Sequence, residues 1–216
     1  MKIALIGATG FVGSHVLNEL IDRGHEVVAI ARNVDKIPAD NLVTAVAANV
    51  LDPTEVTAAV AGVDAVISAY NPGWSNPNIY NEFLAGARSI QQGVKDSGVG
   101  RILVIGGAGS LEIKPGLQLI DTPKFPEEFK PGAGAAREYL NIIRQETELD
   151  WTYLSPAIEM GPGAPGGRTG SYRTDLNKPV FNESGRSTIS VEDLAVAIAD
   201  EIEHSNHIKE RFTVGY

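Results

Sequence analysis

Three glycines, Gly7, Gly10 and Gly13, are the residues whose spacing points most directly to a chemical role. They follow the apolar run 3–6, which is short and uncharged and is therefore typical of a buried strand. Apolar residues then recur at helical spacing over residues 12–21, so a helix should follow the glycines. A glycine turn between a strand and a helix is the context in which a G-x-x-G-x-x-G pattern predicts dinucleotide binding.

Each glycine has its own expected role in such a turn. Gly7 can make the sharp turn off the strand, Gly10 lets the backbone approach a pyrophosphate, and Gly13 lets the helix pack closely on the sheet. The helix N-terminus then directs free N–H groups and partial positive charge at the phosphates. The competing interpretation is a tight turn that binds nothing.

Arg32 stands where the choice between two cofactors is usually made. It ends the second predicted strand, residues 26–32, where an acid would bind a ribose 2′-hydroxyl and an arginine would accept a 2′-phosphate. Asp35 is the only acid nearby, and it fits the start of a short helical turn instead. The position therefore favours NADP, with NAD possible; the alternative is a solvated surface charge.

Strands and helices alternate along the rest of the chain. This alternation predicts a single α/β domain over residues 1–216, a Rossmann-type doubly wound parallel sheet. Asp52 and Pro53 suit the start of one helix, and Ser190 with Asp193 resembles a capping box at the start of the last one. The further predicted strands lie at 42–47, 63–67, 101–105, 151–154 and 211–214.

Ligands of open α/β sheets bind outside the carboxyl ends of the strands, so the strand tips are candidate site segments. The loop before Asp52, which includes Val50, should lie beside an adenine ring, and Ser68, Ala69 and Tyr70 should face the same crevice. The small residues 106–109 would let a flat nicotinamide ring lie close to the backbone.

Two segments lack a clear period. The stretch from Ser110 to about residue 130 is expected to be a long loop or a few short turns. Glycine and proline dominate residues 156–170, Pro165 among them, so the segment 156–188 is predicted to be a mobile flap over the reactive end of the cofactor.

Composition limits the function further. A net charge of −9 disfavours nucleic acid as a partner, and the absence of cysteine excludes disulfides, thiolate catalysis and zinc–thiolate sites. No run of eighteen apolar residues and no basic leader before the first strand is present, so we expect a cytoplasmic protein without a membrane span. His204 and His207 fit a solvated helix end, and no metal site is predicted.

The chain resembles the atypical short-chain dehydrogenases/reductases. The closer likeness is to their small single-domain branch, which contains NmrA-like proteins, biliverdin reductase B-like enzymes and NADH-flavin reductases. The motif GATGFVG is specific for dinucleotide binding in this superfamily, and the other segments are supportive. The segments that carry the resemblance are 7–13, 31–33, 106–111, 150–156 and 190–195.

The resemblance implies roles for particular residues. The stretch Thr9, Gly10, Phe11 and Val12 would contact the pyrophosphate, and Arg32 would hold the 2′-phosphate. The remaining implied contacts are Ser68 and Ala69 beside the adenosine ribose, and Ser155 with Pro156 near the nicotinamide amide.

The departure from the superfamily concerns its acid/base pair, Tyr-x-x-x-Lys. No tyrosine here precedes a lysine by four residues, and Tyr139 comes too late and fits the apolar stripe of its helix. Tyr80 is expected in the core, with a position in the cleft as the alternative, and Tyr70 and Tyr153 are expected near the cleft. Ser110 resembles the usual serine partner but lies beyond its place, so it is a weak catalytic candidate and is equally explained by turn chemistry.

Two functions follow. The first is an NAD(P)H-dependent reductase of a small conjugated acceptor, flavin-like, quinone-like or tetrapyrrole-like, whose electronics replace a protein acid. The second is an NmrA-like sensor that binds NAD(P) and passes its redox state to a partner. A sugar-nucleotide epimerase is weaker because such enzymes need the tyrosine and a larger C-terminal part. Sequence leaves the oligomeric state open.

Overall fold

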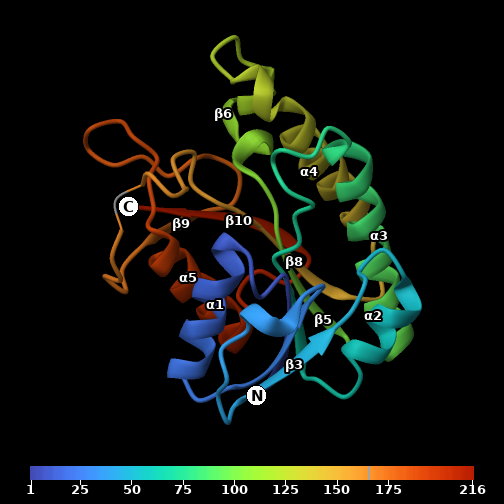
Figure 1. The fold of residues 1–216 in the computed structure, drawn as a ribbon. Helices are drawn as coiled ribbons and strands as arrows, with labels where there is room; N and C mark the ends of the chain where they lie inside the picture. The colour runs from blue at the N-terminus through green and yellow to red at the C-terminus, as the bar shows by residue number, and fades with distance from the viewer. Residues whose placement is uncertain (165) are drawn as a thin grey trace.

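The computed structural model describes residues 1–164 and 166–216; Pro165, within the predicted flap, lies outside the described residues. The described residues form an eight-stranded sheet in the order β3-β2-β1-β4-β5-β8-β10-β9, in which β9 alone is antiparallel to its neighbour. The predicted Rossmann-type parallel sheet is therefore confirmed (Figure 1). Its strands are β1 (Lys2–Ile6), β2 (Glu26–Ala31), β3 (Val43–Ala47), β4 (Ala65–Ser68), β5 (Arg101–Ile105), β8 (Asp150–Ser155), β9 (Arg173–Asp175) and β10 (Glu210–Gly215).

Helices cover both faces of this sheet (Figure 1). α1 (Phe11–Asp22) and α5 (Val191–His204) pack together on one face. α2 (Pro53–Ala59), α3 (Ile79–Ser97) and α4 (Lys130–Ile143) pack side by side on the other. Two buried apolar clusters fill the two layers, which explains why the central strands are apolar on both sides rather than alternating. None of the described helices is long and apolar enough to cross a membrane.

The order of the strands places a topological switch at β1, which lies between β2 and β4. The chain leaves β1 toward α1 on one face and leaves β4 toward α3 on the other. Loops that leave adjacent strands in opposite directions open a crevice at the carboxyl edge of the sheet. The glycine turn after β1 and the loop after β4 form the two sides of this crevice.

The long segment after β5 contains more structure than the sequence indicated. It holds a two-stranded hairpin, β6 (Glu112–Lys114) and β7 (Leu117–Gln118), with Gly116 in the left-handed region (φ +75°). Strands of two and three residues are too short to give a period, so the hairpin could not be predicted. The expected short turns are present as 3₁₀ turns: η2 (Ala108–Ser110), η3 (Leu119–Asp121) and η4 (Glu127–Phe129). A further such turn, η1 (Val34–Lys36), follows β2.

Part of the segment 156–188 is attached to the edge of the sheet. β9 pairs antiparallel with β10, with Asp175 opposite Thr213, and Glu159 forms a bridge with Thr188. The sequence did not indicate β9, because three exposed polar residues give no strand signal. The mobility of the remaining segment stays a prediction.

Asp193, at the start of α5, anchors the same segment. Ser190 Oγ accepts a hydrogen bond from the Asp193 N–H at 3.0 Å, so the predicted N-cap is confirmed. The reciprocal bond of a capping box is absent, because the Tyr216 hydroxyl accepts from the Ser190 N–H instead. The buried Asp193 carboxylate accepts from Thr169 N, Thr169 Oγ1 and Gly170 N, and from the Tyr216 hydroxyl.

We expect Asp193→Ala to lower the free energy of unfolding by at least about 1.5–3 kcal/mol, the contribution of one hydrogen bond to a charged group. Burial raises the pKa of Asp193, but the hydrogen bonds from Thr169, Tyr216 and Gly170 outweigh it, so the pKa is lowered. A lowered pKa contributes stability above the unfolded value of about 3.9 that is lost as the pH falls through the folded value.

The difference between wild type and Asp193→Ala in denaturant unfolding should therefore be larger at pH 7 than at pH 3. The matched control is Glu183→Ala, which removes an exposed carboxylate from the same part of the chain. An equal loss of stability in both variants would contradict the anchoring role of Asp193.

Candidate active site at the carboxyl edge of the sheet

Gly7 follows β1 directly and lies against the ends of β2 and β4. Its φ is +82°, and its N–H donates to the carbonyl of Ile30 at 2.9 Å. A Cβ at Gly7 would lie 2.7 Å from the carbonyl oxygen of Ala69, in the loop after β4. The left-handed backbone and this close approach both require glycine, so the expected sharp turn is confirmed.

Gly13 packs against the turn rather than directly against the sheet. A Cβ at Gly13 would lie 2.0 Å from the carbonyl oxygen of Gly7 and 2.8 Å from its carbonyl carbon. The helix does pack closely at Gly13, as expected, but it packs against the turn that follows β1 and not against the sheet. Gly13 therefore lets α1 begin directly above this turn.

Gly10 differs from the other two glycines because the space beside it is nearly free. It is exposed and has an extended backbone (φ −79°, ψ 171°), and a Cβ there would meet only the Gly7 carbonyl oxygen, at 3.3 Å. Gly10 is the N-cap of α1, which has no side-chain cap and no acid in its first turn. Among the described residues the Gly7 carbonyl oxygen is the one group that a side chain at this position would press against, and the cradle fits an approaching anion.

The other residues expected at the pyrophosphate surround this helix start. Thr9 and Val12 are half-buried, and Phe11 is exposed with its ring edge-on to His15 at a centroid distance of 5.7 Å. The first backbone N–H groups of α1 thus lie beside side chains that are accessible from outside. Their contact with a cofactor stays a prediction.

Arg32 borders a hollow of about 230 Å³ at the carboxyl ends of β2 and β3. The side chain is exposed, and the hollow includes Asn49 and Glu55, whose carboxylate accepts from the Asn49 N–H at 2.7 Å. A cation at the rim of a hollow beside the glycine turn suits a 2′-phosphate. The complete lining is Arg32, Ala47, Ala48, Asn49 and Glu55.

The predicted adenine loop lies beside this hollow. Val50 directs its side chain into the core between the sheet and α2, so only its backbone is available to a ligand. Asp52 Oδ1 accepts from the Thr54 N–H at 2.8 Å, which confirms the simple capping role at the start of α2.

The loop after β4 lines the crevice with its backbone, whereas the Tyr70 side chain packs against α3. Ser68 is buried at the end of β4, and Ala69 N–H donates to the Ile6 carbonyl at 2.9 Å. The Tyr70 hydroxyl donates to the carbonyl of Glu82 at 3.1 Å, and its ring covers α3 so closely that a Cβ at Gly86 would lie 2.3 Å from it. Burial and the nearby Glu82 raise the pKa of Tyr70, against an opposing effect of Arg32.

Gly106, which follows β5, must be glycine because the side chain of Tyr153 occupies the space beside it. A Cβ at Gly106 would lie 2.0 Å from the hydroxyl of Tyr153, which fills the space beneath. That the small residues 106–109 admit a nicotinamide ring stays a prediction. Ser155 is fully buried, and among the described residues no group hydrogen-bonds its Oγ or the Oγ1 of Thr213, its neighbour on β10. The contact of Ser155 and Pro156 with the nicotinamide amide stays a prediction.

No tyrosine of the described cleft residues is placed as a tuned acid. Tyr139 is buried, as predicted, and Tyr153 is buried as well, although we expected it at the cleft. The Tyr153 hydroxyl donates to the Ala136 carbonyl at 2.8 Å, and burial raises the pKa of both phenols. Tyr80 was expected in the core but is 41 % exposed, because it lies in the first turn of α3 and covers Gly134 of α4.

Ser110 is buried at the end of η2, away from solvent. Arg211 donates to its carbonyl oxygen at 3.3 Å and lies 3.4 Å from its Oγ. This placement favours the turn role that the sequence left open over a catalytic one. The Arg211 contact could not be predicted, because 101 residues separate the two positions.

Known proteins resemble this chain over its full length. The pattern of a family described as NAD(P)H-binding matches residues 7–205. The uncharacterized protein YwnB of Bacillus subtilis is 40% identical over 217 residues, which cover 99% of this chain and 98% of YwnB.

Two solved structures agree with this assignment. One is from Bacteroides thetaiotaomicron, provisionally named an epimerase, with TM-score 0.92 and 47% identity over 100% of this chain and 96% of the other. A Streptococcus pneumoniae protein, provisionally named an NADH-flavin reductase, has TM-score 0.86 and 37% identity over 100% and 99% of the two chains. This chain belongs to the NAD(P)H-binding family of atypical short-chain dehydrogenases/reductases.

Proposed function

We propose that the protein is an NAD(P)H-dependent reductase of a small conjugated acceptor, flavin-like, quinone-like or tetrapyrrole-like, and that it prefers NADP. The observation that carries the proposal is the start of α1, where Gly10 leaves an uncapped helix N-terminus open to an anion. The name of the Streptococcus pneumoniae relative supports a flavin-like acceptor.

In this proposal, different residues bind different parts of the cofactor. The backbone of Gly10, Phe11 and Val12 holds the pyrophosphate, and Arg32 holds the 2′-phosphate. The end of β8, at Ser155 and Pro156, lies near the nicotinamide amide. When bound, the reduced nicotinamide supplies a hydride, and the acceptor's own electronics take it up.

No protein tyrosine supplies the proton in this proposal, because Tyr139 and Tyr153 are buried with raised pKa values. Solvent or the acceptor supplies it. We therefore expect Ser110→Ala and Tyr80→Phe each to slow single-turnover NADPH oxidation with a flavin by less than about 100-fold, the low end of general acid catalysis. A thousandfold loss with cofactor binding intact would reveal a dedicated proton donor.

The proposal is tested by following oxidation of NADPH and NADH, side by side, with FMN, riboflavin and a quinone. Steady NADPH oxidation with at least one acceptor, abolished in Gly10→Val, is the expected result. Tight NADPH binding with no turnover of any acceptor would contradict the reductase function.

Tight NADPH binding without turnover would favour an NmrA-like redox sensor, and one feature of the surface supports this alternative. Trp74 and Phe129 are exposed and in edge-to-face contact at a centroid distance of 5.5 Å, and Tyr80 is exposed nearby on α3. Exposed aromatic side chains of this kind suit a partner surface. An epimerase role is not proposed, because the chain lacks the Tyr-x-x-x-Lys pair that such enzymes use.

A further inference from the structure

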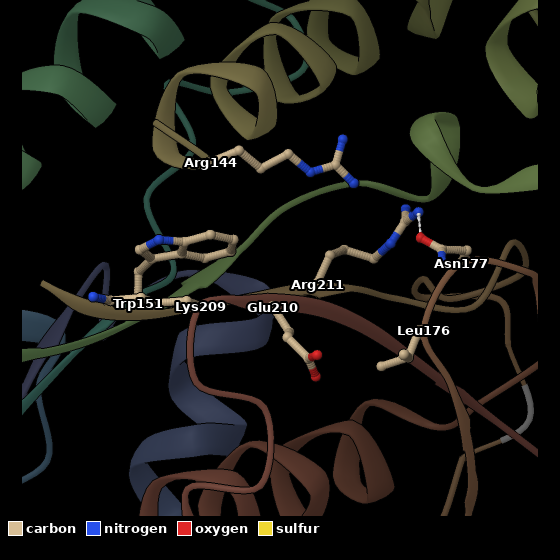
Figure 2. Close-up of a pocket in the computed structure, with 7 residues that line it drawn as sticks. All are labelled: Arg144, Trp151, Leu176, Asn177, Lys209, Glu210 and Arg211. Carbon is tan, nitrogen blue, oxygen red and sulfur yellow. Dashed lines mark hydrogen bonds between the residues drawn. The ribbon is translucent and has the colours of Figure 1, made fainter. Parts of the chain in front are cut away.

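A second hollow, of about 240 Å³, lies over β8 and β10 beside the end of α4 (Figure 2). Its floor is formed where β8 and β10 begin, and its wall by Arg144, the residue directly after α4. In the order of the sheet, β4, β5 and β8 lie between β1, which the glycine turn follows, and β10, so the two sites are separate. The lining residues are Arg144, Trp151, Leu176, Asn177, Lys209, Glu210 and Arg211.

Arg211 is a buried cation without a carboxylate partner. It is 5 % exposed, and among the described residues no acid lies within 4.0 Å of its nitrogens. Nη2 donates to Asn177 Oδ1 at 2.6 Å and Nη1 faces Ser110, but no described group accepts from Nε. Buried charges are normally paired, so this guanidinium calls for an anion that the chain does not provide.

Arg144 brings a second positive charge to the same place. Its side chain extends from the end of α4 toward the guanidinium of Arg211 (Figure 2). Burial, followed by the charge of Arg144, lowers the pKa of Arg211. Arg144 is exposed, and two neighbouring cations repel each other unless an anion lies between them.

The nearby acidic side chains do not form an ion pair with Arg211. Glu112 and Asp175 raise the pKa of Arg211, but among the described residues neither carboxylate lies within 4.0 Å of its nitrogens. Glu210 lines the hollow, but its carboxylate points away from both arginines in Figure 2. Lys209 adds a further cation at the rim, where its ammonium donates to the Thr147 carbonyl at 2.9 Å.

We propose that the hollow between Arg144 and Arg211 binds a small oxyanion of the phosphate class. Two guanidinium groups present planar donor forks that match phosphate oxygens. The volume is below the ~300–1,000 Å³ of pockets for drug-sized ligands, so the occupant is inorganic phosphate or a small phosphomonoester. The site is independent of the proposed reductase activity.

Calorimetric titration with inorganic phosphate, at ionic strength held constant with sodium chloride and with NADPH present at saturation, tests this site. We expect saturable binding that Arg144→Gln weakens at least tenfold. The matched control is Arg88→Gln, which removes an exposed cation from α3. A parallel titration with glycerol 3-phosphate distinguishes the free ion from a phosphomonoester, since the tighter ligand identifies the source.

The cofactor edge could also attract phosphate, so Arg32→Ala is titrated without NADPH; it should bind phosphate at the Arg144 site with unchanged affinity. The proposal is overturned if wild type shows no saturable binding, if Arg144→Gln binds as wild type does, or if Arg88→Gln loses as much affinity as Arg144→Gln. Loss of all binding in Arg32→Ala would assign the phosphate to the cofactor edge instead.

Discussion

Gly10→Val should abolish binding of the nicotinamide cofactor while the protein stays folded. The backbone of Gly10 is extended, a conformation that valine adopts readily, and among the described residues a Cβ would meet one atom, the Gly7 carbonyl oxygen at 3.3 Å. The valine side chain would therefore project from the turn into the space that the pyrophosphate needs. Replacing a glycine N-cap by valine should cost at most about 1–2 kcal/mol of stability.

Calorimetry with NADPH and denaturant unfolding measure the two effects separately. Gly13→Ala is the matched contrast, because its Cβ would lie 2.0 Å from the Gly7 carbonyl oxygen and must disrupt the turn. We expect Gly10→Val to lose affinity and keep its fold, and Gly13→Ala to lose stability. An unchanged NADPH affinity in Gly10→Val would refute the dinucleotide site.

Arg32→Ala is expected to weaken NADPH by about tenfold or more and to leave NADH nearly unchanged. Loss of a charge-assisted hydrogen bond costs about 1.5–3 kcal/mol, and each 1.4 kcal/mol is tenfold in affinity. NADH has no 2′-phosphate, so it should not sense the change.

Lys36→Ala serves as the control for Arg32→Ala, because it removes an exposed cation four residues further along. It should leave the ratio of the two affinities as it is in wild type. If Arg32→Ala weakened both cofactors equally, Arg32 would not be the reader of the 2′-phosphate.

Local chemistry explains which features could be predicted from the sequence. The glycine spacing after an apolar run predicted the β1–turn–α1 unit, and Asp52 before Pro53 predicted the start of α2. These signals involve neighbouring residues only. The continuous apolar strands alternating with helices likewise predicted the parallel sheet, since strands buried on both faces have few polar residues.

Features that depend on distant contacts could not be predicted. The side chain of Asp193 holds Thr169 and Tyr216 rather than completing a capping box, and Arg211 meets Ser110 across the fold. Tyr80 was expected in the core but is exposed, and Tyr153 was expected near the cleft but is buried. Helical or strand spacing does not say which neighbour covers a residue.

The central claim is that this chain directs hydride transfer from a bound reduced nicotinamide. Single-turnover oxidation of NADPH carrying deuterium at one or the other face of C4, with FMN as acceptor and cofactor saturating, tests it most directly. We predict a primary isotope effect for one face only, because a site that fixes the ring presents a single face to the acceptor. Absence of an isotope effect for both faces, or equal effects for the two, would contradict the account.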